Sequence, residues 1–392
     1  ALTLDDDLQD DAYAALDAHL DGLGTSGVPD THPLRGALLA MDAVTGEILA
    51  CAGRDADGAA SPEACWKDTD LRPGSAFKPA VALAALGSAD PTVRAMLDGD
   101  LPSGLRRAAL SGTLTAARLP ALPLGSEPDL SLRTRLRNFR GVASPRDRAL
   151  EGALRSSDNV WFGYLGLLMH EPLREGWAGV GIVDDARRER AWPVHALARR
   201  AGFDTPLDLG FGVRGAAGRV PSDEPDSDAP IAARSVGQDG VRATPLGIAS
   251  FLAAIATDGT TPRASLVPGG SGVEERLISR RGASRLRDAL HAVVLKGTAA
   301  RAFSDNPDRS LVFGKTGSSQ RIDAQGVPRT DSWFGGVVMP PEGGVGHPVV
   351  LVGVLPGAGL GGAHAAEVVD AFSRAVVKAR GWGVRMPGGP DS

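Results

Sequence analysis

Cysteine, lysine and long apolar runs are scarce in this chain of 392 residues, and each shortage excludes something. A membrane-spanning helix needs about 20 consecutive apolar residues. The longest apolar run here, Val349–Leu355, has only the length of a strand. The seven histidines are scattered and form no cluster with cysteine, so we expect neither a metal site nor a cofactor. A net charge of −5 without a basic run argues against nucleic acid as a partner.

The two cysteines, Cys51 and Cys65, lie close together in the sequence. The first is expected to end a strand and the second to lie in a loop. A disulfide and two free thiols are both compatible with this spacing, because sequence separation does not define the geometry of a bridge.

Lysine is the rare cation. Among 42 cationic side chains only five are lysines, at positions 67, 78, 296, 315 and 378. Arginine stays protonated in proteins, whereas the amine of a buried lysine can be tuned to act as a base. A lysine retained in so arginine-rich a chain therefore hints at chemistry, and we use this hint for Lys78 and Lys315.

Strand patterns lie at both ends of the chain and helical patterns in the middle. Residues 36–50 are typical of a hairpin, and three further strands are expected between residues 311 and 356. Apolar residues at helical spacing predict helices near both termini and around Ser157. We predict one α/β layer formed by residues 1–83 and 234–392, with a mainly helical insert at 84–233.

The first motif is Ser75-Ala-Phe-Lys78, which follows a Pro-Gly turn. Residues i and i+3 of a helix share a face, so a helix beginning at Ser75 would place the Lys78 amine beside the Ser75 hydroxyl. Pro79 is tolerated in the first turn, where its missing N–H has no partner to lose. The N-terminus of this helix would also direct N–H groups towards an oxyanion. By itself, Ser-x-x-Lys is as compatible with a helix cap and an exposed lysine.

The second motif, Ser-Asp-Asn, occurs twice. Ser304-Asp-Asn306 is followed by Pro307 and Asp308, which is ordinary turn chemistry. Ser157-Asp-Asn159 lies between two apolar helical runs, where a polar triplet is expected to line a cleft. We therefore assign a site role to Ser157 and Asn159 and a turn role to the later copy.

The third motif is Lys315-Thr316-Gly317, at the end of a predicted strand. Gly317 allows a ligand to approach the backbone closely, while Thr316 and Ser318 offer hydroxyls to a carboxylate and Lys315 supplies positive charge. Alone, this triplet is common at strand ends, so it indicates a binding site only when the other two motifs are also present.

In this order the three motifs are the signature of penicillin-binding proteins and class A β-lactamases, and the chain resembles the penicillin-binding protein transpeptidase domain over most of its length. Residues 72–79 are similar to the nucleophile segment of that family, and residues 235–245 to a Gly-Gln-Gly loop in which Asp239 replaces the second glycine. Residues 84–150 match least. The resemblance implies an α/β fold with an antiparallel sheet flanked by helices and an all-helical subdomain.

The same resemblance implies a role for each motif residue. Ser75 would be the acylated nucleophile and Lys78 its base. Ser157 would relay a proton to the leaving group, and Asn159 would hold the substrate amide. The terminal carboxylate would be bound by Lys315, Thr316 and Ser318, beside Gly317, and the N–H groups of Ser75 and Ser318 would form the oxyanion hole.

The implied activity is peptidoglycan D,D-transpeptidation through an acyl-enzyme, with stem peptides as substrates, β-lactams as inhibitors and other proteins of cell-wall synthesis as candidate partners. The implied location is extracytoplasmic. The chain starts at Ala1 rather than Met, so we expect an export signal or anchor outside this sequence.

Proteins with three other activities carry the same three motifs. A D,D-carboxypeptidase would hydrolyse the same acyl-enzyme, and a penicillin sensor would acylate without turnover. A class A β-lactamase needs a Glu-Pro-x-Leu-Asn loop well beyond the second motif. Glu171-Pro-Leu-Arg174 comes too early and lacks the asparagine, so we interpret Pro172 as a helix stop.

Overall fold

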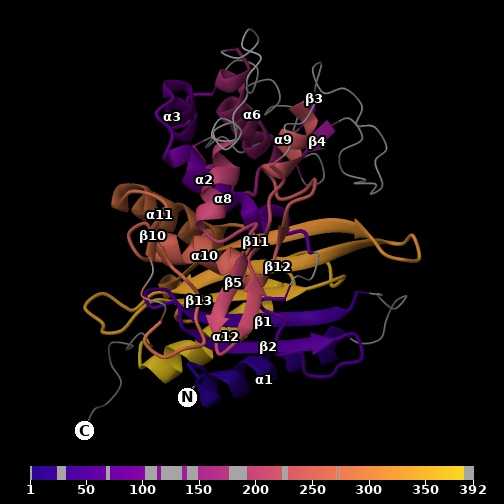
Figure 1. Ribbon diagram of the computed structural model, residues 1–392, viewed down its shortest axis with the longest axis vertical. Helices are drawn as coiled ribbons and strands as arrows, with labels where there is room; N and C mark the ends of the chain where they lie inside the picture. Colours follow the sequence, from indigo (N-terminus) through magenta and orange to yellow (C-terminus); the bar gives the residue numbers. More distant parts are fainter. Residues whose placement is uncertain are drawn as a thin grey trace.

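The computed structural model describes residues 2–23, 32–67, 71–101, 113–115, 135–138, 149–175, 192–222, 228–270, 272 and 274–383. Its centre is a five-stranded antiparallel sheet in the order β11-β12-β13-β1-β2 (Figure 1). The strands are β1 (Leu34–Asp42), β2 (Ile48–Asp55), β11 (Val312–Ile322), β12 (Pro328–Val338) and β13 (Val349–Leu355). Because β1 pairs with β13, the two ends of the chain form one sheet, and the predicted α/β fold class is confirmed.

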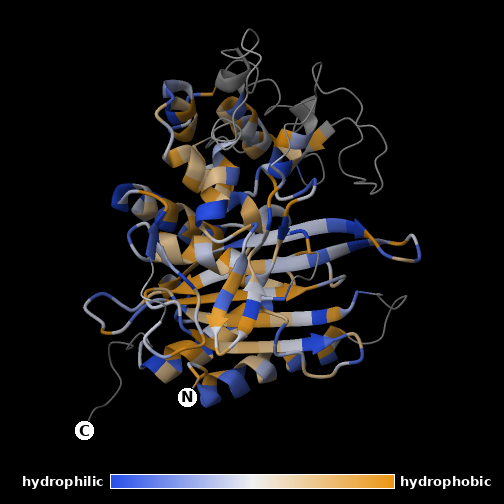
Figure 2. Cartoon of the chain, in the orientation of Figure 1, coloured by the Kyte–Doolittle hydropathy of each residue, from blue (hydrophilic) through white to orange (hydrophobic). Residues whose placement is uncertain are grey.

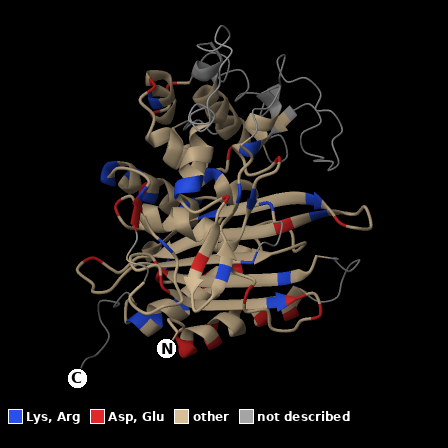
Figure 3. Ribbon diagram, in the orientation of Figure 1, with Lys and Arg blue, Asp and Glu red and all other residues tan. Residues whose placement is uncertain are grey.

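Helices cover both faces of this sheet. On one face lie α1 (Asp6–Leu23) and α12 (Ala365–Arg380), and on the other α10 (Pro245–Ala256) and α11 (Arg280–Lys296) (Figure 1). Every residue of β13 is buried and none is charged, as expected of a strand covered on both sides (Figures 2 and 3). All residues of α10 are buried as well. The core therefore lies between the sheet and its two helical layers.

A second group of elements, largely helical, stands above the β11 edge of the sheet (Figure 1). Its helices are α2 (Lys78–Leu86), α3 (Pro91–Leu97), α5 (Leu150–Arg155), α6 (Asn159–Glu175), α8 (Pro193–Arg200) and α9 (Asp228–Arg234).

Short antiparallel strand pairs accompany the helices. They are β3 (Thr113–Thr115) with β4 (Arg135–Arg137), β5 (Pro206–Gly210) with β6 (Val213–Ala216), β7 (Gly218–Arg219) with β8 (Arg242–Ala243), and β9 (Thr260–Pro262) with β10 (Glu274–Arg276). Segment 84–233 thus contains strands as well as helices. The domain division at residues 84 and 233 stays a prediction.

One predicted helix boundary is wrong. Helix α6 continues past Pro172 to Glu175, although we expected the proline to stop it. A proline in the last turn removes only one backbone hydrogen bond, and the helix ends within the next few residues.

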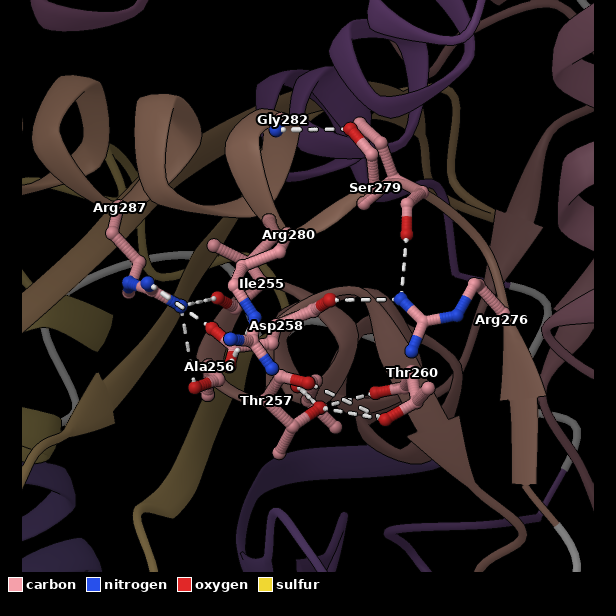
Figure 4. A network of polar contacts seen from close by, with 12 residues as sticks. Ile255, Ala256, Thr257, Asp258, Thr260, Arg276, Ser279, Arg280, Gly282 and Arg287 are labelled. Carbon is pink, nitrogen blue, oxygen red and sulfur yellow. Dashed lines mark hydrogen bonds and ion pairs between the residues drawn. The ribbon is translucent and has the colours of Figure 1, made fainter.

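The start of α11 is held by a polar network around Asp258 (Figure 4). Asp258 adopts a φ of +58° in the turn after α10, and its carboxylate pairs with Arg280 Nε at 3.1 Å and Arg287 Nη2 at 3.5 Å. Arg276 Nη1 donates to the Asp258 carbonyl at 3.0 Å, and Ser279 Oγ caps the helix at Gly282 N. The network fixes α11 relative to α10, so the far end of α11 reaches β11 at a defined place.

The cysteines form a disulfide. The Cα atoms of Cys51 and Cys65 lie 6.0 Å apart. The sequence spacing was compatible with either a disulfide or two free thiols, and the structure contains the disulfide. The bond ties β2 to the loop that leads to Ser75, and the Cys65 carbonyl accepts a hydrogen bond from Leu246 N at the start of α10. The cross-link therefore anchors this loop across the sheet.

Candidate active site

Ser75 lies on a tight turn rather than on the α-helix that we predicted. Residues Gly74–Phe77 form a 3₁₀ turn (η1), and α2 begins only at Lys78, whose N–H donates to the Ser75 carbonyl. In a 3₁₀ turn residues i and i+3 eclipse each other. Lys78 is therefore aligned with Ser75 more directly than an α-helix would place it. Ser75 is half-buried and Lys78 fully buried.

The Lys78 amine is bound by the second motif. Its Nζ donates to the carbonyl oxygen of Ser157 at 2.8 Å and to Oδ1 of Asn159 at 2.7 Å, with Ser157 Oγ at 3.3 Å. A neutral amine has two N–H bonds and one lone pair. The two shorter contacts use both N–H bonds, which leaves the lone pair for a hydroxyl.

Burial controls the protonation of this amine. Loss of hydration lowers the pKa of Lys78 well below its usual 10.5, the positive charge of Lys315 lowers it further, and Asp158 opposes them. The lowered pKa makes the neutral form of the Lys78 amine more accessible, and a general base must be in this form to accept a proton.

Ser157 adopts an unusual backbone conformation. Its φ of +57° lies in the left-handed region, which is uncommon for residues other than glycine. This conformation joins α5 to α6 in a sharp turn and brings the Ser157 carbonyl and Asn159 Oδ1 to the same amine. Asp158 is buried and caps α6 through Trp161 N at 2.9 Å, so its side chain supports the turn.

The third motif lies on β11, the edge strand nearest the nucleophile turn. Lys315 is buried, and its Nζ donates to the Thr316 carbonyl at 3.0 Å and contacts Thr316 Oγ1 at 3.3 Å. Burial lowers the pKa of Lys315 to about 7. Thr316 Oγ1 also lies 2.6 Å from Oγ1 of Thr298, just after α11. Thr298 is a neighbour of the site to which our motif analysis gave no role.

Glycines let β11 and the nucleophile turn meet backbone to backbone. A Cβ atom on Gly317 would lie 2.6 Å from the Pro73 carbonyl oxygen, and one on Gly74 would lie 2.6 Å from that of Ser318. The space beside Gly317 is thus filled by the turn that carries Ser75. Ser318 Oγ accepts a hydrogen bond from Gly361 N at 3.0 Å, which leaves its proton available.

The Gly-Gln loop packs against the other side of the nucleophile turn. The Gly237 carbonyl accepts a hydrogen bond from Gly74 N at 3.1 Å. Asp239, which stands where the family pattern has glycine, adopts a φ of +44° and pairs with Arg234 at 3.0 Å. The strained backbone explains why glycine suits this position, and the ion pair contributes to holding aspartate there.

The second Ser-Asp-Asn copy lies apart from these residues. Ser304 is exposed in a turn and its Oγ donates to Asp305 at 3.1 Å. Asn306 is more than a turn residue, because it is buried and its Nδ2 donates to Asp370 at 2.7 Å. The structure thus brings Lys78 together with Ser157 and Asn159, and sets β11 beside the turn of Ser75, while the later copy anchors α12.

Among the described residues no group of three or more histidine, cysteine, aspartate or glutamate side chains is arranged to hold a metal ion. Within the same ranges, none of the helices combines the length and apolar character that crossing a bilayer requires.

The model of the penicillin binding protein transpeptidase domain family matches residues 138–373, more than half of the chain. The chain belongs to the penicillin-binding protein transpeptidase family. Members carry a peptidoglycan transpeptidase-type activity and are extracytoplasmic in general. The matched range includes the second and third motifs but begins after Ser75 and Lys78, so their assignment depends on the geometry above.

Solved structures share this transpeptidase fold. A peptidoglycan glycosyltransferase from Burkholderia ambifaria aligns with a TM-score of 0.65 and 21% identity, over 99% of this chain and 100% of that one. The TP domain of Burkholderia pseudomallei penicillin-binding protein 3 aligns with a TM-score of 0.66 and 19% identity, over 98% of both chains.

Penicillin-binding protein A from M. tuberculosis, solved as a ceftriaxone acyl-enzyme complex, aligns with a TM-score of 0.64 and 20% identity, over 95% of this chain and 79% of that one. No curated protein matches this sequence closely enough to count as a relative.

Proposed function

We propose that this transpeptidase-family domain is a D,D-transpeptidase that cross-links peptidoglycan stem peptides through an acyl-enzyme on Ser75. The observation that carries the proposal is the environment of Lys78. A buried amine with a lowered pKa lies one 3₁₀ turn from a half-buried serine, and both of its N–H bonds are directed to the second motif.

Acylation follows from this arrangement. Ser75 Oγ attacks the carbonyl carbon between the two terminal D-alanines while its proton passes to Lys78 Nζ. The N–H groups of Ser75 and Ser318 stabilise the oxyanion. Ser157 relays the proton to the leaving amine, the C–N bond breaks, and D-alanine departs. Asn159 holds the donor amide throughout.

The third motif binds the carboxylate of the donor peptide. Lys315 supplies charge, and the hydroxyls of Thr316 and Ser318 supply donors, while Gly317 lets β11 approach the turn that carries Ser75. With a pKa of about 7, Lys315 is about half protonated at neutral pH. An arriving carboxylate favours the charged form of the lysine, so the anion and the proton bind together.

The acyl-enzyme then requires an acceptor. In transpeptidation the amine of a second stem peptide attacks the ester carbon and gives up a proton to Lys78. The bond between this carbon and Ser75 Oγ then breaks, Lys78 passes the proton to Ser75 Oγ, and a new amide remains. The Cys51–Cys65 disulfide supports an oxidising, extracytoplasmic compartment for this reaction, where stem peptides are located.

Intact-mass spectrometry tests the proposal. After treatment with penicillin we expect a stable adduct of one β-lactam, which is absent in Ser75→Ala. Rapid return to the free mass would indicate a β-lactamase instead. No adduct on the folded protein would refute Ser75 as the nucleophile.

A stem-peptide assay separates the remaining activities. Release of D-alanine with incorporation of an added acceptor amine indicates a transpeptidase. Release without incorporation indicates a D,D-carboxypeptidase, and a stable β-lactam adduct without any release indicates a penicillin sensor.

A further inference from the structure

Asparagine is rarer in this chain than lysine. The sequence contains three, Asn138, Asn159 and Asn306. Asn138 follows strand β4 and is buried. Its Oδ1 accepts two hydrogen bonds from the start of α6, from Asn159 N at 2.8 Å and from Val160 N at 3.1 Å. One buried side chain thus holds the helix that carries the second motif.

These two bonds complete the beginning of α6. The first N–H groups of an α-helix have no partner within the helix and need one from outside. Asp158 supplies one, because its Oδ1 accepts from Trp161 N at 2.9 Å, and its carbonyl accepts the first regular helical bond, from Phe162 N at 3.2 Å. The N–H groups of Asn159 and Val160 are bound by Asn138, which lies 21 and 22 positions earlier.

Asn159 links this cap to the candidate base. Its backbone N–H donates to Asn138 Oδ1, and its own Oδ1 accepts the hydrogen bond from Lys78 Nζ at 2.7 Å. The other short contact of that amine, the Ser157 carbonyl, lies two residues before Asn159. A shift at the start of α6 would therefore move both acceptors of Lys78 together.

The identity of the residue also matters. The N-terminus of a helix favours a negative charge, so aspartate at position 138 would satisfy the same N–H groups and suit the helix dipole better. An aspartate would, however, add a second carboxylate near Lys78, where Asp158 already favours the charged amine against the effects of burial and of Lys315. Asparagine binds the N–H groups without adding that charge.

We propose that Asn138 is a positioning residue for acylation, which holds the second motif against Lys78 without adding a further charge beside the amine. The proposal rests on the proposed function, in which Lys78 is the base for Ser75. It predicts two separable effects: loss of the cap misplaces the acceptors, and a charged cap alters the protonation of Lys78.

The test compares Asn138→Ala and Asn138→Asp with a matched control, Asn306→Ala. Asn306 is also buried and donates to Asp370 and Ser373, but its side chain binds no motif residue in the described part of the chain. Acylation by a fluorescent penicillin gives the rate constant k2 and the apparent dissociation constant Ks separately. Thermal unfolding shows that each variant is folded.

For Asn138→Ala we expect k2 to fall about 10- to 100-fold with Ks changed less than about twofold, as for displaced catalytic groups. Asn306→Ala should lose stability and keep k2. If folded Asn138→Ala acylates at the wild-type rate, or if both alanine variants lose k2 equally, the proposal is wrong.

Asn138→Asp tests whether a negative charge at position 138 alters the protonation of Lys78. It also tests the proposal if Asn138→Ala does not fold. Because the chain has five lysines, ¹³Cε-lysine labelling gives five NMR signals, and Lys78 can be titrated directly. We expect Asn138→Asp to raise the Lys78 pKa by about 1–2 units. The acylation profile should move to higher pH by the same amount, with k2 recovering in alkaline solution. An unmoved Lys78 titration would overturn the proposal.

A failure of the proposed function can be distinguished from a failure of the proposal for Asn138. If wild-type protein forms no adduct on Ser75, the function is wrong. The Lys78 titration in Asn138→Asp still measures whether this residue controls the amine.

Discussion

Lys78 Nζ donates a hydrogen bond of 2.7 Å to Oδ1 of Asn159, although the two residues are 81 positions apart in the sequence. The contact joins the first and second motifs in one buried polar cluster. It fixes the direction of the amine, while burial and the charge of Lys315 lower the pKa of Lys78 and so favour its deprotonated form.

Lys78 and Lys315 should respond differently to arginine. Lys78→Arg should abolish acylation, with a loss of at least about 10³-fold, because a guanidinium cannot accept a proton at neutral pH. Lys315→Arg should be milder, because that position supplies charge rather than a proton acceptor. Stopped-flow acylation measures both, after unfolding curves show that each variant is folded. Equal losses would contradict the division of roles.

The two Ser-Asp-Asn copies provide a matched pair of serines. Ser157→Ala should slow acylation by about 10²–10⁴-fold if Ser157 relays a proton. Ser304→Ala should leave the rate unchanged, because Ser304 is exposed and its Oγ contacts only Asp305 among the described residues. An effect of Ser304→Ala on k2 comparable with that of Ser157→Ala would refute the assignment.

Lys315 should make stability depend on pH. Its pKa of about 7 in the folded protein is below the 10.5 of the unfolded chain. Between these values the unfolded state holds more protons, so the free energy of unfolding rises with pH by up to about 1.4 kcal/mol per unit. Urea unfolding at pH 7 to 9.5 measures the slope. Lys315→Met should reduce the slope without abolishing it, because Lys78 also has a lowered pKa. An unchanged slope would show that the pKa of Lys315 is not lowered.

The disulfide should stabilise the fold by about 3 kcal/mol, because it closes a loop of 14 positions between Cys51 and Cys65. We expect a reducing agent to lower the melting temperature of the wild type and to leave that of the double alanine variant unchanged. Equal melting temperatures for oxidised and reduced wild type would argue against a stabilising bridge.

The sequence alone predicted the fold class, which the structure confirms, and it identified the residues of the three motifs, whose roles stay predictions. The apolar, strand-length runs of β1 and β13 supported the fold prediction. The motif residues were identified by the order of the three motifs and by the family resemblance that this order carries, since the spacing of Ser75 and Lys78 is equally compatible with a helix cap. The choice between the Ser-Asp-Asn copies also followed from local neighbours, since Pro307 favours a turn and apolar helices flank Ser157.

Only the tertiary structure decided the rest, because those features depend on contacts between distant segments. No local pattern marks Asn138 as the cap of α6 or Thr298 as the partner of Thr316, since each becomes meaningful only when another element is placed beside it. The cysteine spacing permitted a bridge, but the path of the chain across the sheet brought Cys51 and Cys65 together. The low pKa of Lys78 is likewise a property of burial beside Lys315, which no sequence spacing encodes.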